Sequence, residues 1–162
     1  MRLSGWLLAL VVGLAACDVQ KIRELEEGVS TEADVRQRFG EPAATYPEAG
    51  GARTLEYPRQ PEGQRNYMIT IGADGKMSAL RQVLTPPNFA QVQPGMDKAQ
   101  VRRVLGLPGR TQFYELKKEE VWDWRWLDGA QNKIFSVTFG ADGRVTASAV
   151  ADDPRDMQTG GR

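Results

Sequence analysis

An internal duplication constrains this chain more than any other feature of its sequence. Residues 31–42, TEADVRQRFGEP, correspond to residues 97–108, DKAQVRRVLGLP, and a glycine lies shortly upstream of each block. Farther along, residues 67–77, YMITIGADGKM, match residues 135–145, FSVTFGADGRV, in the same order and at nearly the same spacing. Two matched blocks in one order indicate a tandem repeat, in which each copy forms one supersecondary unit.

Each copy has the signals of a short helix near its start. Thr31 and Asp97 are favourable N-caps, and a polar residue three positions later completes a capping box. Two apolar residues four positions apart then mark one buried face, and a glycine and a proline end the helix. In the two copies these residues are Val35, Phe39, Gly40 and Pro42, and Val101, Leu105, Gly106 and Pro108. A further short helix is expected before each, over residues 19–27 and 87–92.

After each helix the apolar periodicity changes to two, which predicts strands. Alternating apolar residues occupy 55–57, 67–71 and 77–79 in the first copy, and 122–126, 135–139 and 145–147 in the second. The Gly-Ala-Asp-Gly segments at 72–75 and 140–143 are typical of turns between strands. The predicted fold is α+β, with two tandem repeats. Each has helices followed by an antiparallel three- to four-stranded meander, with the helices on one sheet face; a continuous sheet through both repeats is left open.

These residues resemble the BamE family of outer-membrane lipoproteins, also called SmpA/OmlA. The resemblance is carried by the helix block 95–108, the aromatic strand Trp122-Asp-Trp124 and the strand–turn–strand through 140–143. It covers nearly all of the chain after residue 16, once per repeat, and the second repeat is the better match. It implies two helices on a three-stranded antiparallel sheet. It also implies a non-catalytic role in the machinery that inserts β-barrels into the outer membrane.

The duplication is a departure from that family, whose members typically carry one such unit. Two units in tandem resemble the architecture of the secreted β-lactamase-inhibitor protein, whose concave sheet holds a protein partner. An inhibitor-like or protein-binding module that holds a periplasmic protein is therefore the alternative to a BamE-type adaptor. Exposed aromatic residues on the open sheet face would favour that alternative.

The first seventeen residues predict export and lipidation. A single Arg2 precedes an apolar run over residues 6–16, which is shorter than the roughly 20 residues of a membrane-spanning helix. Leu14-Ala-Ala-Cys17 resembles the lipobox that is cleaved before the cysteine, so Cys17 is expected to carry acyl chains as a membrane anchor. In enteric bacteria an aspartate directly after the lipidated cysteine is the signal for retention in the inner membrane, and Asp18 occupies that position. The family resemblance favours the outer membrane, and Asp18 leaves this open.

The expected domain organisation is a signal peptide over 1–16, repeat one over 17–86, repeat two over 87–151 and a disordered polar tail over 152–162. The chain has 21 basic and 21 acidic residues, so it lacks the net positive charge that nucleic-acid binding requires. It has no histidine and one cysteine, which excludes histidine-dependent triads and most zinc sites. We therefore expect no enzyme activity, no metal and no cofactor apart from the lipid on Cys17.

Three aromatic residues are the candidate partner-binding residues. Trp122, Trp124 and Trp126 alternate along one strand and provide a large apolar area of the kind enriched at interaction hot spots. The competing interpretation is that they pack under the helices, and it is favoured for Trp122 and Trp124, whereas Trp126 is expected to be the more exposed. The charged loop 59–65 is interpreted as solvated, with a partner or lipid contact as the alternative. The expected partners are the membrane, through the acyl chains, and barrel-assembly subunits or another periplasmic protein.

Overall fold

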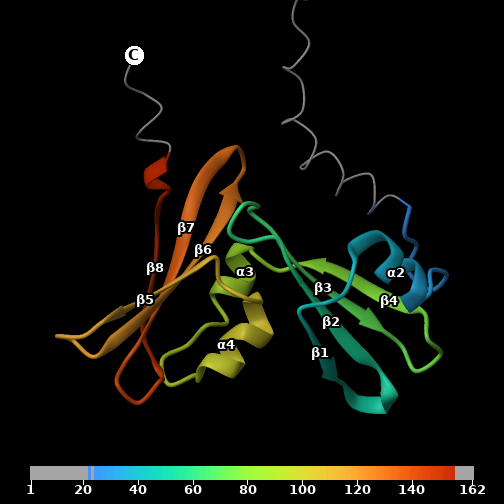
Figure 1. The fold of residues 1–162 in the computed structure, drawn as a ribbon, viewed down its shortest axis with the longest axis horizontal. Coiled ribbons are helices and arrows are strands. Elements are labelled where there is room, and N and C mark those ends of the chain that lie inside the picture. Colours follow the sequence, from blue (N-terminus) through green and yellow to red (C-terminus); the bar gives the residue numbers. More distant parts are fainter. Residues whose placement is uncertain (1–21, 23, 156–162) are drawn as a thin grey trace, which may run out of the picture.

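The computed structural model describes residue 22 and residues 24–155 (Figure 1). The predicted signal peptide, Cys17 and Asp18 lie outside the described residues, as do 19–21 and 23 of the expected first helix. Of the described remainder of that segment, Ile22 is helical, and residues 24–27 contain turns and irregular backbone. Among the described residues, no helix has the length and apolar character needed to cross a bilayer.

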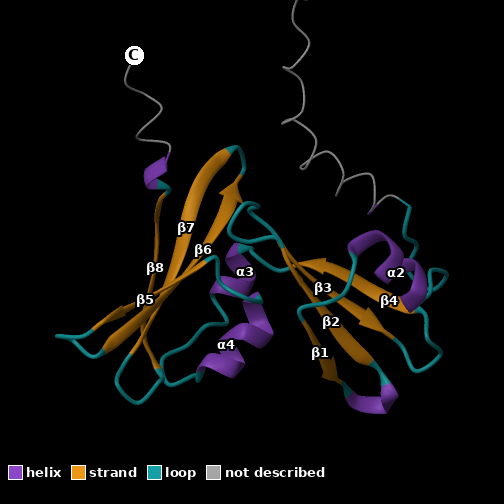
Figure 2. Ribbon diagram, viewed as in Figure 1, coloured by secondary structure: helices purple, strands orange, loops and turns teal. Residues whose placement is uncertain are grey.

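The two repeats fold as two units with the same order of elements (Figure 2). The first contains α2 (Glu32–Phe39), β1 (Ala44–Pro47), a short 3-10 turn (Ala49–Gly51), β2 (Arg53–Pro58), β3 (Asn66–Ile71) and β4 (Met77–Gln82). The second contains α3 (Pro86–Phe89), α4 (Lys98–Leu105), β5 (Arg110–Tyr114), β6 (Glu119–Asp128), β7 (Gln131–Phe139) and β8 (Val145–Asp152). The predicted α+β fold with two tandem repeats is confirmed.

Each unit contains its own four-stranded antiparallel sheet. The strand orders are β1-β2-β3-β4 and β5-β6-β7-β8, and no strand pairing joins the two sheets within the described residues. The duplication therefore does not produce one continuous sheet. The fourth strand of each sheet, β1 or β5, is an addition to the three strands that the BamE resemblance implies, and it pairs with the strand that follows it.

The helix ends are as the sequence predicts. Thr31 and Asp97 are the N-caps of α2 and α4, and both helices have a complete capping box. Gly40 and Gly106 end these helices with φ angles of 82° and 76°, a region that favours glycine. A buried aromatic residue then fixes each end, because Tyr57 donates a hydrogen bond to the carbonyl of Gly40 at 3.0 Å. Trp124 makes the equivalent bond to Gly106.

The elements stack in the order α2, first sheet, α3 and α4, second sheet (Figure 1). Apolar residues of α2 and the facing side of the first sheet form one core, which consists of Val35, Phe39, Leu55, Tyr57, Tyr67, Ile69, Ile71 and Met77. The helices of the second repeat and the facing side of its sheet form the other, which consists of Leu84, Phe89, Val92, Val101, Leu105, Trp124, Trp126, Phe135, Val137, Phe139 and Val145. Each sheet thus buries one face under its own helices.

The prediction that the disordered tail begins at residue 152 is wrong, because the ordered chain continues beyond that residue. β8 continues to Asp152, and Asp153 is 1% exposed. The backbone N–H of Asp153 donates to the carbonyl of Asn132, and its carboxylate binds Arg125 at 2.5 Å. These contacts order a segment whose polar composition suggests solvent exposure. Residues 156–162 lie outside the described residues.

Candidate partner-binding surface

The three tryptophans of β6 face the helices of the second repeat. Trp124 is completely buried, and Trp126 is 4% exposed. The expectation that Trp126 is the exposed one of the three is wrong, because β6 and β7 extend beyond the length of β2 and β3 and carry Trp126 under α3. There the ring of Phe89 meets Trp126 edge-on at a centroid distance of 4.9 Å.

Trp122 is the one tryptophan of the three that a partner can reach, because it is only partly buried. Its indole N–H donates to Glu120 at 2.6 Å, and the Lys98 ammonium lies 5.9 Å from its ring centroid. Hydrogen bonds from Lys98 and from Trp122 lower the pKa of Glu120 below its usual value. This lysine–carboxylate–indole group closes the end of the core beside the N-terminus of α4.

A buried carboxylate joins the two repeats. Glu56, on the face of β2 that points away from α2, is 0% exposed. It accepts hydrogen bonds from the Arg102 guanidinium of α4 at 3.0 Å and from the Leu107 backbone N–H at 2.7 Å. The Tyr46 hydroxyl donates to the same carboxylate at 2.6 Å. Burial, together with this bond, raises the pKa of Tyr46 to about 12. A buried charge with this many donors is well satisfied.

Asn66 completes the joint from β3. Its side-chain amide donates to the carbonyls of Leu105 and Leu107, at 2.8 and 2.9 Å. These are carbonyls at the C-terminal end of α4, which have no partner within the helix. A Cβ on Gly106 would lie 2.9 Å from the same amide, so glycine is required here both for its positive φ and for the close approach. The second face of the first sheet is thus the docking platform of α4.

The loop over residues 59–65 is a third connection between the repeats. The prediction of a solvated loop holds for Pro61, Glu62 and Arg65, which are exposed, but not for Gln60 and Gln64. β5 pairs with β6 only as far as Asp123, so beyond this residue β6 has no strand partner on that edge. The Gln60 side chain occupies this edge: its amide donates to the Arg125 carbonyl at 2.7 Å and its oxygen accepts from the Arg125 N–H at 3.2 Å. Gln64 also bonds to Asn132. These contacts hold the loop against the second sheet.

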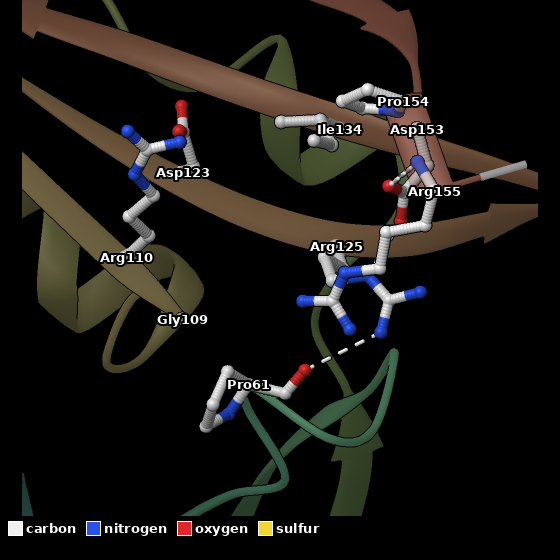
Figure 3. A pocket seen from close by; sticks show the side chains of 9 residues that line it. All are labelled: Pro61, Gly109, Arg110, Asp123, Arg125, Ile134, Asp153, Pro154 and Arg155. Carbon is white, nitrogen blue, oxygen red and sulfur yellow. Dashed lines mark hydrogen bonds and ion pairs between the residues drawn. The ribbon is translucent and has the colours of Figure 1, made fainter. Parts of the chain in front are cut away.

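The second face of the second sheet is not covered by α2, α3 or α4, and it carries a cavity of about 250 Å³, whose lining includes the helical residues Pro154 and Arg155 (Figure 3). The cavity lies between this face and Pro61 of the loop. Arginine and aspartate side chains dominate its lining, which consists of Pro61, Gly109, Arg110, Asp123, Arg125, Ile134, Asp153, Pro154 and Arg155.

The charges of the cavity are only partly paired with one another. Burial by itself raises the pKa of Asp153, but the hydrogen bonds from the Arg155 backbone N–H and from the Arg125 guanidinium outweigh it and lower the pKa. Asp123 accepts a hydrogen bond from the Ser136 hydroxyl at 2.6 Å. Arg110 and Arg155 are exposed at the rim. This arrangement suits a partner surface that presents carboxylates, because guanidinium groups bind them in a bidentate geometry.

The β5–β6 hairpin adds an apolar surface at the far end of the second sheet. Phe113, Tyr114 and Leu116 are exposed large apolar side chains. Sequence reasoning did not single them out, because their alternation is short and is interrupted by charged residues. Exposed apolar residues of this kind are common at interaction sites when they are contiguous.

The family comparison concerns the second of these units. Residues 82–149 match the family model described as the outer membrane protein assembly factor BamE domain. The second repeat is therefore similar to a BamE domain. The match begins at the end of β4 and runs through most of β8, so it includes α4, the tryptophan strand and the open sheet face. The resemblance that the sequence shows to the BamE family is confirmed for this part of the chain.

Solved structures that match this chain have low sequence identity to it. A structure described as an osmotically inducible lipoprotein, OsmE, is 24% identical over 47% of this chain and 86% of its own, with a TM-score of 0.38. YjgB from Bacillus subtilis, a DUF4309 family protein, is 22% identical over 83% and 86%, with a TM-score of 0.33. A Streptococcus mutans protein described as a beta-lactamase inhibitor is 12% identical over 85% and 97%, with a TM-score of 0.34. The curated proteins contain no match.

No group of three or more His, Cys, Asp or Glu side chains in the described ranges is placed to hold a metal ion. The BamE family is non-catalytic, so the BamE domain is interpreted through its surfaces. Those surfaces are the open face of the second sheet with its cavity, the exposed hairpin and the partly exposed Trp122.

Proposed function

We propose that this protein is a lipid-anchored, non-catalytic adaptor of the BamE type that assists outer-membrane protein assembly and supports envelope integrity. The observation that carries the proposal is the BamE family match over residues 82–149. Cys17, at the end of a predicted signal peptide, supplies the anchor through covalent acyl chains. The outer membrane is the favoured location, and Asp18 makes the inner membrane the alternative.

The joint between the repeats supports an adaptor role. Glu56, Asn66 and Gln60 each bond the first repeat to the second, and together they connect the anchored unit to the BamE domain. A partner bound to the open face of the BamE domain is thereby held at a fixed distance from the first repeat. The first repeat acts as a rigid mount, and the second presents the binding surfaces.

The test is a mild-detergent pull-down of the tagged protein from its native envelope, with mass spectrometry of the recovered proteins. We expect barrel-assembly subunits to co-purify. Deleting the BamE domain is a poor control, because it would expose Glu56 and Asn66. The variant of choice reverses two exposed charges at the cavity rim, Arg110→Glu with Arg155→Glu, and is expected to lose the subunits.

A matched control distinguishes a specific surface from a change in net charge. Lys76→Glu with Arg144→Glu makes the same charge change at exposed positions outside the cavity and the hairpin, and we expect it to retain the subunits. Cys17→Ser should release the protein from the membrane fraction. Recovery of an unrelated periplasmic protein, with no assembly subunit, would instead establish the inhibitor-like alternative. That protein would have to use the second sheet, since α4 covers the first.

A further inference from the structure

The last strands of the two repeats differ at their outer edges. β4 and β8 each end a sheet and pair on one side only. Both begin in the same way, because the Gly28 N–H donates to the Met77 carbonyl and the Gly95 N–H donates to the Val145 carbonyl. Beyond that point the edge of β4 is covered by the chain itself, whereas no described residue covers the edge of β8.

A carboxylate covers β4. Glu27 accepts a hydrogen bond from the backbone N–H of Leu80 at 2.9 Å and pairs with the Arg81 guanidinium at 2.7 Å. The Leu80 hydrogen bond and the Arg81 guanidinium lower the pKa of Glu27, so the carboxylate is ionised at neutral pH. The first repeat therefore occupies the outward-facing donor of its own edge strand.

All three residues of this cover are replaced in the second repeat. Pro94, the residue before Gly95, stands where the first repeat has Glu27. The strand registers align Leu80 with Ser148, and Arg81 with Ala149. The second repeat thus has neither the carboxylate nor the arginine, while the strand that they would cover is kept and lengthened to eight residues.

The free hydrogen-bonding groups on β8 follow from its pairing. The Asp153 N–H points toward β7, because it donates to the Asn132 carbonyl at 3.1 Å. Directions alternate along a strand, so the N–H groups of Ser148, Val150 and Asp152 point away from β7. In the part of the chain that the structure describes, no group bonds to them. The N–H of Leu80, which corresponds to Ser148, also points away from the neighbouring strand. This independently supports the assignment of outward N–H groups on β8.

The side chains of β8 leave this edge accessible. Val150 is 53% exposed beside Phe135, on the helix side of the sheet. Ala147, Ala149 and Ala151 are exposed on the open side and are too small to shield a neighbouring backbone. Natural edge strands are normally blunted by lysine, proline, bulges or short length. From Ala147 to Ala151 this strand has no charged residue and no proline.

We propose that β8 binds an extended segment of a partner protein by strand addition, with main-chain hydrogen bonds to Ser148 and Val150. The occupant is a strand with alternating apolar side chains, because Val150 offers an apolar contact on one side and the alanines leave room on the other. Unassembled β-barrel strands have this alternation, so the inference deepens the proposed function and rests on it for the source of the strand. The edge itself is independent of the cavity face.

The probe is a fluorescein-labelled peptide of alternating threonine and valine, flanked by lysines for solubility. Its binding to the purified full-length protein is followed by fluorescence anisotropy. We expect saturable binding, and we expect none for an analogue that is N-methylated at every threonine and valine. That analogue keeps the side chains but cannot donate main-chain hydrogen bonds. Equal binding of the two peptides would overturn strand addition.

Three protein variants test whether the peptide binds at the edge of β8. Val150→Pro removes an outward N–H without breaking a bond to β7, and we expect binding about tenfold weaker. Val150→Ala keeps the N–H and is the control, expected to remain within about threefold. Pro94→Glu with Ala149→Arg transplants the cover of the first repeat and is expected to block the peptide. Circular dichroism establishes that each variant is folded.

The outcomes separate this inference from the proposed function. Absence of peptide binding by the folded wild-type protein would overturn the inference, while the pull-down and its cavity-rim variant would still test the adaptor role. A dimer by light scattering that Val150→Pro converts to a monomer would also overturn it, since the occupant would then be a second copy. Loss of peptide binding in the Pro94→Glu and Ala149→Arg variant would locate the site at the β8 edge.

Discussion

The two repeats share one plan and differ in what covers their sheets. The sheet of the first repeat has α2 on one face and α4 on the other, so both faces are occupied (Figure 1). The sheet of the second repeat has α3 and α4 on one face, and none of α2, α3 and α4 lies on the other. The two copies of a duplicated unit can therefore differ in role. One copy packs against the other through its second sheet face, and the other copy leaves its second sheet face open to a partner.

Equivalent residues show how this division arises. Glu56 and Asp123 occupy the same position on the second face of their sheets, one residue before Tyr57 and Trp124. Glu56 is completely buried under α4 and binds Arg102, whereas Asp123 is half-buried, binds Ser136 and lines the open cavity. Both copies have the acidic residue, but of the two only Glu56 is paired with a guanidinium group within the described residues.

The largest effect is expected from removing the carboxylate at the joint. Glu56→Ala leaves Arg102, the Leu107 N–H and Tyr46 without their acceptor, and should lower the free energy of unfolding by about 3–5 kcal/mol. Asp123→Ala is the matched change in the open repeat and should cost about 1 kcal/mol. Urea denaturation of the purified proteins gives both values. Equal losses would contradict the division between platform and open surface.

The same experiment reports on the coupling of the repeats. Because α4 bonds to both sheets, the wild-type protein should unfold in one cooperative transition. Glu56→Ala should broaden that transition or split it into two, with tryptophan fluorescence following only the second repeat among the described residues. A single sharp transition in the variant would show that Asn66 and Gln60 are sufficient to couple the units.

An intermediate effect on stability is expected from removing the ion pair between Asp153 and Arg125 at the end of β8. This pair has no counterpart in the first repeat. The ionised form of Asp153 stabilises the folded state, because its pKa is lower there than the value of about 3.9 in an unfolded chain. This contribution is present above the unfolded value and is lost as the pH falls through the folded value. Asp153→Asn should cost about 2 kcal/mol at pH 7. Urea denaturation at two pH values measures it.

The control for this prediction is Asp152→Asn, which removes the adjacent carboxylate in an exposed position. Asp152 pairs with Lys133 on the surface, so its loss should have a small effect at either pH. For Asp153→Asn, the difference from wild type should shrink markedly near pH 3. A difference that stays the same at both pH values would show that packing, and not the ionised pair, is responsible.

Local signals were sufficient to predict the elements of the fold. The capping boxes at Thr31 and Asp97, the glycines that end the helices and the alternation of apolar residues each depend on near neighbours, and each is present in the structure. Because the same signals occur in both copies, each predicted element is supported twice. The fourth strand that the prediction allowed in each repeat, β1 or β5, was not located in the sequence, because its exposed, mixed composition gives little periodicity.

The contacts between repeats could not be predicted in the same way. Glu56 lies between two apolar residues in a strand, and a charge at that position reads equally well as a solvated face. Gln60 and Asn66 are polar residues whose partners are backbone atoms far along the chain, and backbone atoms leave no signal in a sequence. Trp126 was misplaced because the extra length of β6 and β7 is decided by packing under Phe89.

The smallest effect is expected at the helix caps, where the two repeats are most alike. Thr31→Ala and Asp97→Ala each remove the side-chain acceptor of a capping box, and each should cost about 1 kcal/mol in urea denaturation. The exchanges Thr31→Asp and Asp97→Thr keep an acceptor and are the controls, expected to be nearly neutral. Since α2 packs on one sheet and α4 on two, a clearly larger cost at Asp97 would mean that the sandwiched helix transmits the loss to both units. Equal costs would confine the difference between the repeats to their sheet faces and edges.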